Sequence, residues 1–232
     1  MAHPHRPGPS TPAHATHHGH AHKPAKSGGA GKSRASFVRE FLKNPTATAA
    51  IAPSSRILAR RMIDGIDLAA CRSIVEFGPG SGVMTRAMLD QLPRGWFARD
   101  GGKGTFIAIE YNPTMAAIIA EEFPQATVAT DSAANIEALC TRHGVTPGTL
   151  DVVISGLGWA SFPPALTTQI LEATARTLRP GGHFRTFAYH VGLLKKNAWH
   201  LRAELKRLFG QVETAHGAWA NLPPAFVYRC VK

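Results

Sequence analysis

The sequence predicts an α/β fold built on a mostly parallel sheet, and three observations lead to this prediction. A β-branched run, 73–77, leads directly into a turn with glycine at alternate positions, and a helical pattern follows it. Further short apolar runs then alternate with helical patterns along the chain. One of these runs, 151–155, is nearly all apolar, as a parallel strand buried on both faces should be. Such alternation is typical of a doubly wound sheet.

Length and composition fit one such domain with an appendage. The 232 residues are 44% hydrophobic, which is enough for a sizeable core, and 18% are charged. The three scattered cysteines favour a reduced, intracellular setting over a disulfide framework. No apolar run approaches the roughly 20 residues that span a bilayer, and the N-terminus lacks the pattern of a secretory signal. We therefore expect neither an integral membrane protein nor a secreted, disulfide-stapled module.

Residues 1–34 form a separate basic segment. They carry five bases and no acid, out of a net charge of +11. Because they hold almost no large apolar side chain, burial cannot offset their chain entropy, and we predict a disordered tail. The tail contains seven histidines, but ligand spacing alone does not fix a metal site in a flexible chain, so we predict no metal. The basic charge indicates either an anionic partner or a solubilising role.

Residues 35–65 are predicted to form two amphipathic helices ahead of a main domain at 66–232. The first groups Phe37, Phe41 and Leu42 on one side, with bases opposite. The second begins at a serine cap, and its predicted inner residues are Ile57, Leu58 and Met62. These helices can cover a sheet, or lie in a lipid interface with apolar residues in the bilayer and bases at the headgroups.

The glycine turn after residue 77 is the most informative segment. It reads Glu76-Phe77-Gly78-Pro79-Gly80-Ser81-Gly82. Glycines let the backbone approach a ligand closely, and the N–H groups at the start of the next helix suit a polar or anionic group. The third glycine comes one residue earlier than in the dinucleotide-binding pattern.

Polar residues follow the next predicted strands at their carboxyl ends. Glu110, with Tyr111 beside it, ends the strand predicted at 105–109, and an acid there can accept both hydroxyls of a ribose. Asp131 and Ser132 end the strand predicted at 126–132, and Ser155 ends the strand at 151–155.

Together these elements resemble the class I S-adenosylmethionine-dependent methyltransferases, with Glu76 to Gly82 as their first motif. The resemblance implies a Rossmann-like fold, with a seven-stranded, mostly parallel sheet, helices on both faces and the last strand antiparallel. It also implies S-adenosylmethionine as cofactor. The residues implied to bind it are Glu76, Gly78, Pro79, Gly80, Gly82, Glu110, Tyr111, Asp131, Ser132 and Ser155, with Asp131 and its neighbour at the adenine amino group.

A second resemblance covers residues 36–232. Three segments are similar to motifs of the soluble bacterial phospholipid N-methyltransferases: Phe41-Leu42-Lys43-Asn44-Pro45, Ile51-Ala52-Pro53-Ser54-Ser55-Arg56 and Asn221-Leu222-Pro223-Pro224-Ala225-Phe226-Val227-Tyr228-Arg229. This resemblance implies the amine of phosphatidylethanolamine as methyl acceptor. It further implies a cytoplasmic enzyme that binds peripherally to an anionic lipid surface at the inner face of the membrane. The stretch after 188 departs from the family, which leaves other aminolipids such as ornithine lipids open.

Five residues are candidates for the acceptor side of the reaction. Tyr189 and His190, at the exit of the fifth strand, are predicted to contact the amine, which must lose a proton before it can attack. Trp159 can face a cation with its ring, or pack in the core. Asn221 and Tyr228 line the acceptor pocket or lock the last hairpin.

Two other classes of function remain as alternatives. The glycine motif is also similar to that of the rRNA adenine dimethyltransferases, but those enzymes carry Asn and Pro after strand four, where this chain has Ser155-Gly156-Leu157. An RNA substrate is therefore disfavoured. A protein that binds cofactor or lipid without catalysis is the third class.

Overall fold

The computed structural model describes residues 54–190, 196–215 and 225–232, which belong to one compact unit, Glu40–Lys232. Seven strands form one sheet: β1 (Ser73–Phe77), β2 (Thr105–Glu110), β3 (Thr127–Thr130), β4 (Leu150–Ser155), β5 (Leu178–Tyr189), β6 (Gln211–Ala215) and β7 (Ala225–Val231). The α-helices of the described residues are α2 (Ser54–Ile63), α3 (Val83–Leu89), α4 (Pro113–Glu122), α5 (Ile136–Arg142), α6 (Pro164–Thr177) and α7 (Lys196–Leu208). The predicted tail and the helix around Phe41 lie outside the described residues.

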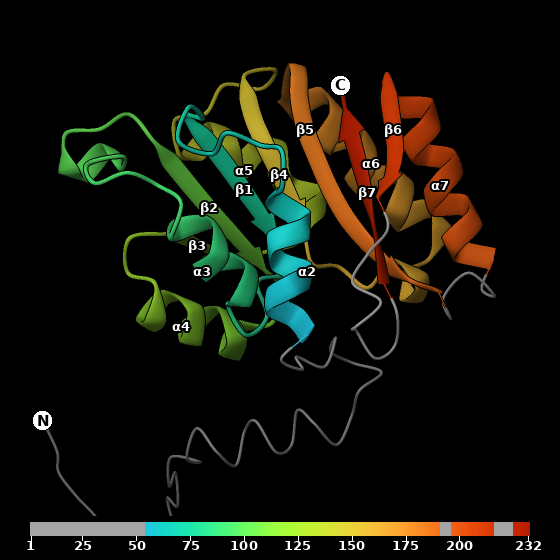
Figure 1. Ribbon diagram of the computed structural model, residues 1–232, viewed down its shortest axis with the longest axis horizontal. Helices are drawn as coiled ribbons and strands as arrows, with labels where there is room; N and C mark the ends of the chain where they lie inside the picture. Colours follow the sequence, from blue (N-terminus) through green and yellow to red (C-terminus); the bar gives the residue numbers. More distant parts are fainter. Residues whose placement is uncertain (1–53, 191–195, 216–224) are drawn as a thin grey trace, which may run out of the picture. The chain divides into compact units, whose positions relative to one another are not determined.

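The strand order is β3-β2-β1-β4-β5-β7-β6 (Figure 1). Neighbours among β1 to β5 pair in parallel, and β7 is antiparallel to both β5 and β6. The predicted seven-stranded, mostly parallel sheet with an antiparallel last strand is thus confirmed. The sequence placed β1 at the residues observed and ended β2 at Glu110, as observed, because apolar runs bounded by polar residues mark buried strands well.

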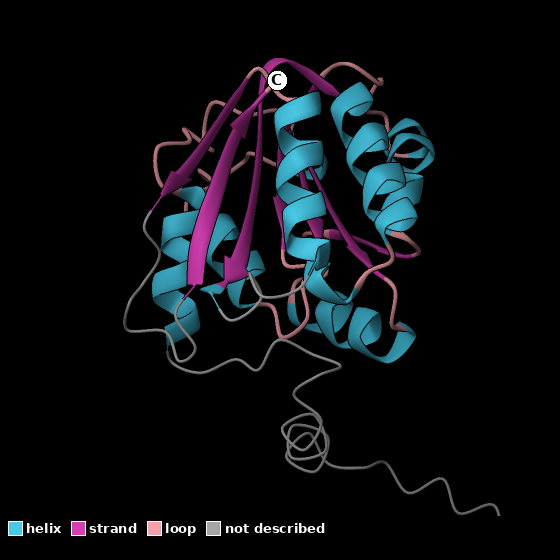
Figure 2. Cartoon of the chain, turned by 90° about the vertical axis from the view of Figure 1, so that its right-hand side faces the viewer, coloured by secondary structure: helices cyan, strands magenta, loops and turns pink. Residues whose placement is uncertain are grey.

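Helices cover both faces of the sheet (Figure 2). Successive strand residues point to opposite faces, so Val75 and Phe77 join one buried cluster while Ile74 faces the other. Helices α5, α6 and α7 pack on the first face, which we call the α7 face. Helices α2, α3 and α4 pack on the second, which we call the α2 face.

Helix α2 differs from its prediction at one position. Leu58 and Met62 are buried, as expected, but Ile57 is 45% exposed. The buried stripe also contains Ala59 and Ile63, so it is rotated toward the side away from Ile57. A small alanine fits close against the sheet, whereas the sequence pattern counted only large apolar residues.

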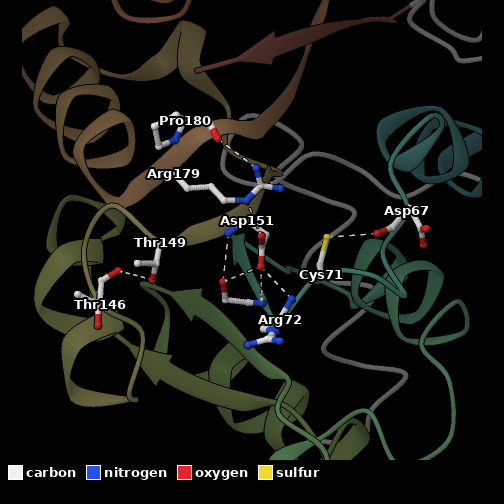
Figure 3. A network of polar contacts seen from close by, with 9 residues as sticks. Asp67, Cys71, Arg72, Thr146, Thr149, Asp151, Arg179 and Pro180 are labelled. Carbon is white, nitrogen blue, oxygen red and sulfur yellow. Dashed lines mark hydrogen bonds and ion pairs between the residues drawn. The ribbon is translucent and has the colours of Figure 1, made fainter.

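Asp151 holds three elements together at the amino ends of the strands (Figure 3). Its Oδ2 accepts bonds from the backbone N–H groups of Arg72 (2.8 Å) and Ser73 (3.0 Å) and from the Ser73 hydroxyl (3.2 Å). Its Oδ1 accepts a bond from Arg179 Nε at 2.7 Å. Burial opposes ionisation, but the bonds from Arg179, Arg72 and Ser73 outweigh it and lower the pKa of Asp151. This carboxylate therefore aligns β1, β4 and β5 at the edge opposite the glycine turn.

Gly82, at the start of α3, is constrained by conformation and by space. Its φ is +78°, and a Cβ there would lie 2.4 Å from Cε2 of the buried Phe123. Gly144 has a similar φ of +79° with nothing within 4 Å of the same position. We expect Gly144→Ala to cost about 1 kcal/mol of unfolding free energy from the left-handed conformation alone. Gly82→Ala should cost roughly 1–3 kcal/mol more through overpacking.

Denaturant unfolding of both variants measures this difference. Equal losses for the two variants would show that Phe123 moves aside without cost.

Candidate active site

The candidate site lies where the winding of the sheet reverses. The chain runs from β1 to its neighbour β2 on one side, whereas β4, the neighbour of β1 on the other side, continues to β5 in the opposite direction. Doubly wound sheets bind ligands at this point, outside the carboxyl ends of the strands. The glycine turn, Glu110, Asp131 and Ser155 all follow or end strands at this edge.

The glycine turn is bonded to the strands on both sides. The N–H of Gly78 donates to the Ile109 carbonyl at 2.9 Å, and the N–H of Gly156 donates to the Phe77 carbonyl at 2.7 Å. A Cβ on Gly78 would lie 3.1 Å from Leu157 Cδ2, and one on Gly156 would lie 2.7 Å from the Gly78 carbonyl oxygen. The turn therefore lies directly against the exit of β4, and glycine is needed on both sides of this contact.

Glu110 lies beside the glycine turn, although 30 residues separate it from Gly80. Its Oε2 accepts a bond from the Gly80 N–H at 3.3 Å, and its Oε1 accepts one from the Asn112 N–H at 2.9 Å. The parallel register of β1 and β2, which pairs Phe77 with Ile109, brings the turn and the acid together. This is the arrangement that ribose binding by Glu110 requires, and the binding itself stays a prediction.

Asp131 and Ser132 continue the same edge beyond Glu110. The Asp131 N–H donates to the Glu110 carbonyl at 3.2 Å. The Asp131 Oδ1 accepts from the Ser132 N–H (2.6 Å) and from Asn135 Nδ2 (2.8 Å), while Ser132 Oγ accepts from the Ala134 N–H at 3.2 Å. These bonds fix the carboxylate in place. Tyr111, next to Glu110, is 81% exposed.

Glu76 is a fully buried carboxyl directly before the turn. Its Oε2 accepts a bond from the Thr85 hydroxyl at 2.7 Å, while its Oε1 has no partner among the described residues. Burial raises the pKa of Glu76 to about 8, and the charge of Glu110 adds to the rise. Thr85 follows the glycine motif in the sequence. Its role follows from its position on α3 facing β1, which no local pattern specifies.

Ser155 and Pro79 lie within the same framework. Ser155 is fully buried at the end of β4, and its Oγ accepts a bond from the Leu157 N–H at 3.3 Å. The Pro79 carbonyl accepts from the Gly82 N–H at 2.8 Å and so closes the turn. Both therefore shape the backbone of the site, and their contact with a ligand stays a prediction.

The structure does not bring Tyr189 and His190 together. Tyr189 packs edge-on against Phe187 on the α2 face, with ring centroids 5.5 Å apart. His190 packs against Phe226, which belongs to the α7 face, at 5.2 Å. Strand residues alternate between faces, and His190, the first residue after β5, continues this alternation, so the two side chains diverge although the sequence predicted them as a pair. Burial raises the pKa of the Tyr189 phenol, which stays protonated at neutral pH.

Trp159 and Tyr228 are both packed inside the protein. For each of them, packing was the predicted alternative to contact with a ligand. Trp159 is 2% exposed, donates its indole N–H to Thr186 Oγ1 at 2.7 Å and packs edge-on against Phe184. Tyr228 is equally buried, packs against Phe226, and burial raises its pKa. Contact of either with a substrate stays a prediction, and Asn221 lies outside the described residues.

Within residues 54–190, 196–215 and 225–232 there is no group of three or more His, Cys, Asp or Glu side chains that could hold a metal ion. The histidine-rich tail lies outside these ranges.

Comparison with known proteins places this geometry in context. Residues 75–186 match a family described as a methyltransferase domain. The ornithine lipid N-methyltransferase of Singulisphaera acidiphila is 27% identical over 197 residues, which cover 84% of this chain and 93% of the relative. The matched domain runs from the middle of β1 into β5 and so contains the glycine turn, Glu110 and Ser155.

Solved structures share the fold at low sequence identity. A TehB-like SAM-dependent methyltransferase from Corynebacterium glutamicum has a TM-score of 0.56 and 12% identity, with 86% of this chain and 100% of that chain covered. A SAM-dependent methyltransferase from Archaeoglobus fulgidus has a TM-score of 0.60 at 13% identity, covering 83% and 99%. Human methyltransferase-like protein 13 in complex with SAH has a TM-score of 0.52 at 19% identity, covering 77% and 78%. These likenesses confirm the predicted fold.

The buried Glu76 carboxyl predicts a pH dependence of stability. A carboxyl whose pKa is raised on folding stabilises the protein below its unfolded pKa, and that contribution is lost as pH rises through the folded value of about 8. We expect the melting temperature to fall between pH 5 and pH 8 more steeply in the wild type than in Glu76→Gln. Glutamine keeps the acceptor for Thr85 without the ionisation.

Thermal unfolding across this pH range measures both slopes, with the exposed Glu121→Gln as control. Parallel slopes for the wild type and Glu76→Gln would contradict the assignment of the buried ionisation to Glu76.

Proposed function

We propose that this chain, an S-adenosylmethionine-dependent methyltransferase with the class I fold, transfers a methyl group to the amine of a membrane aminolipid. The methyltransferase class follows from the domain match over residues 75–186 and from the fold. The lipid proposal is carried by one observation, the similarity to an ornithine lipid N-methyltransferase along 93% of that relative's length. A match of that extent includes the strands and helices expected around the methyl acceptor as well as those that form the expected cofactor site.

The residues at the carboxyl edge fit S-adenosylmethionine. The turn places backbone at the ligand where side chains would block it, and Glu76 Oε1 and Ser81 Oγ are buried beside it without partners among the described residues. An orphaned carboxylate oxygen suits a ligand that carries positive charge. When bound, the cofactor supplies an electrophilic methyl group on a sulfonium. A positive charge near Glu76 favours the ionised carboxylate, so binding should lower the pKa of Glu76 from its raised value.

Two acids divide the recognition of the nucleoside. We assign the ribose hydroxyls to Glu110, which the Gly80 and Asn112 N–H groups hold beside the glycine turn. We assign the adenine amino group to Asp131, which the Ser132 N–H and Asn135 fix in position. Tyr111, 81% exposed beside Glu110, offers an aromatic ring to the same nucleoside.

The acceptor must arrive as a neutral amine, because an ammonium has no lone pair. An ordinary alkyl amine titrates near pH 10, so partial desolvation, which disfavours the charged ammonium, must lower its pKa and release its proton to water before it attacks. We assign the contact with the amine to Tyr189 rather than His190, because Tyr189 shares the α2 face with Glu76. Its neutral phenol can accept a hydrogen bond from the amine. Most of the rate should come from holding nitrogen and methyl carbon in line.

Two aminolipid classes fit the proposal. The sequence motifs imply phosphatidylethanolamine, whereas the relative's name favours an ornithine lipid as the second candidate. Both present an amine at the surface of a bilayer. The region that departs from the phospholipid family begins at Tyr189, which lies at the end of β5 where the amine is expected.

A membrane lipid as substrate requires the enzyme to act at a membrane surface. Among the described residues there is no helix long and apolar enough to cross a bilayer. We propose peripheral binding to an anionic lipid surface at the inner face of the cytoplasmic membrane. The basic residues of the N-terminal region support this, since each base near an anionic surface contributes about 1 kcal/mol. Those before residue 54 lie outside the described part of the chain.

Glu110 provides a test of the cofactor site. Glu110→Gln should weaken binding of S-adenosylmethionine by roughly tenfold to a hundredfold, because a carboxylate that accepts two hydroxyl bonds is replaced by a neutral amide. Isothermal titration calorimetry measures the change, with Glu121→Gln on the exposed side of α4 as control. Undiminished affinity in Glu110→Gln would remove the ribose assignment.

The substrate class is tested by transfer from a donor with a radiolabelled methyl group. We expect label in the lipid fraction when the enzyme is incubated with vesicles containing phosphatidylethanolamine or an ornithine lipid, and the two arms rank the candidates. Total RNA serves as the competing acceptor. Label in RNA alone would support the rRNA-type alternative, and donor binding without transfer would support a non-catalytic role.

A further inference from the structure

We infer that the protein docks on the bilayer through the carboxyl edge of its sheet, with the first turns of α2 and α7 entering the lipid interface on either side of the site. This inference rests on the proposed function and adds the orientation of the enzyme and the side chains that make contact. Its first observation is the distribution of exposed apolar residues. The large apolar side chains that are exposed within the described residues are Ile57 (45%), Tyr111 (81%) and Trp199 (58%).

All three of these side chains lie at one edge. Tyr111 directly follows β2 at its carboxyl end. Helix α2 leads back to the amino end of β1, so its first turn, with Ile57, lies at the carboxyl edge. Helix α7 follows the carboxyl end of β5, and its first turn carries Trp199. Figure 1 shows α2 and α7 beginning at the lower side, toward which the arrowheads of β1 and β5 point.

Bonds within the structure fix the beginning of α7 at this edge. Asn197 Nδ2 donates to the carbonyls of Phe162 (2.8 Å) and Ala160 (3.3 Å), in the segment that follows β4. The His200 ring nitrogen lies 3.0 Å from Thr168 Oγ1 on α6. The exposed Trp199 therefore sits on an anchored turn beside the exit of β4.

The two helices bracket the site. Helix α2 packs on one face of the sheet and α7 on the other. The carboxyl ends of β4 and β5, where the amine is expected, lie between them. A flat surface that touches both Ile57 and Trp199 must therefore cross this edge. A lipid headgroup in that surface would reach the site without the lipid leaving the bilayer.

The charge on these helices is complementary to an anionic bilayer. Helix α2 contains no acid, and the exposed Arg56 lies in its first turn beside Ile57. On α7 the exposed Arg202 lies one turn after Trp199, and the acid Glu204 is bonded to Arg207 at 2.6 Å. Aromatic residues such as Trp favour the headgroup level of a membrane, and flanking bases add attraction to anionic lipid. An apolar residue flanked by bases on each side of the site indicates a lipid surface.

Binding to vesicles without methyl donor tests this inference separately from catalysis. The full chain is sedimented with phosphatidylcholine vesicles that contain or lack phosphatidylglycerol. Arg202→Glu should weaken binding to the anionic vesicles by about fivefold or more, which corresponds to losing one base at the surface. Lys103→Glu makes the same change of charge on an exposed residue at the amino edge and should leave binding unchanged. If both variants bound the anionic vesicles equally weakly, the effect would come from net charge rather than from the docking edge, and the inference would be overturned.

Trp199 reports on insertion directly. Lipids with brominated chains should quench the fluorescence of the wild type more than that of Trp199→Ala. Trp96 and Trp159 are buried, and Trp219, which lies outside the described residues, is present in both proteins, so the difference reports on Trp199. Ile57→Ser and Trp199→Ala should each lower vesicle binding while keeping transfer to a short-chain aminolipid below its micelle concentration. Unchanged vesicle binding in both variants would overturn the docking edge. If the variants lowered vesicle binding as expected but the enzyme methylated no aminolipid, the proposed function would be overturned and the docking edge would stand.

Discussion

The pairing of β1 with β2 and β4 is the constraint on which the site depends. These two parallel registers place the glycine turn against Glu110 on one side and against Gly156 on the other. No side chain intervenes at the contact with β4, where an added Cβ on Gly156 would meet the Gly78 carbonyl at 2.7 Å. At this contact the candidate site is therefore shaped by backbone, and the strands that hold it are anchored at their other ends by Asp151.

The same edge holds a group that does not favour folding. Glu76 is fully buried with one oxygen unpartnered among the described residues, and burial raises its pKa to about 8. A well-packed apolar residue would stabilise β1 better than this carboxyl does. A buried acid beside a ligand-binding turn makes physical sense if a cationic ligand completes its environment. The buried carboxyl thus lowers the unfolding free energy of the protein without cofactor, and cofactor binding at this position can restore the lost stability.

The acceptor side is organised by the alternation of faces at the end of β5. Tyr189 points to the α2 face, with Glu76, whereas His190 points to the α7 face, with Phe226 and the buried Trp159. The proposed amine contact, the cofactor edge and the two exposed apolar turns then all lie at the carboxyl edge. An enzyme that takes its substrate from a bilayer needs this coincidence, because a headgroup amine reaches only a short distance from the surface.

The sequence by itself determined the order of the strands through β5, the glycine turn and the acids at the ends of β2 and β3. These are local features, because each strand is a short apolar run and its end is marked by the polar residue that follows. Only the tertiary structure decided which residues share an environment. It paired Thr85 with Glu76, separated Tyr189 from His190, buried Trp159 and exposed Ile57. Such outcomes depend on packing between elements distant in the chain, which the pattern within one element does not encode.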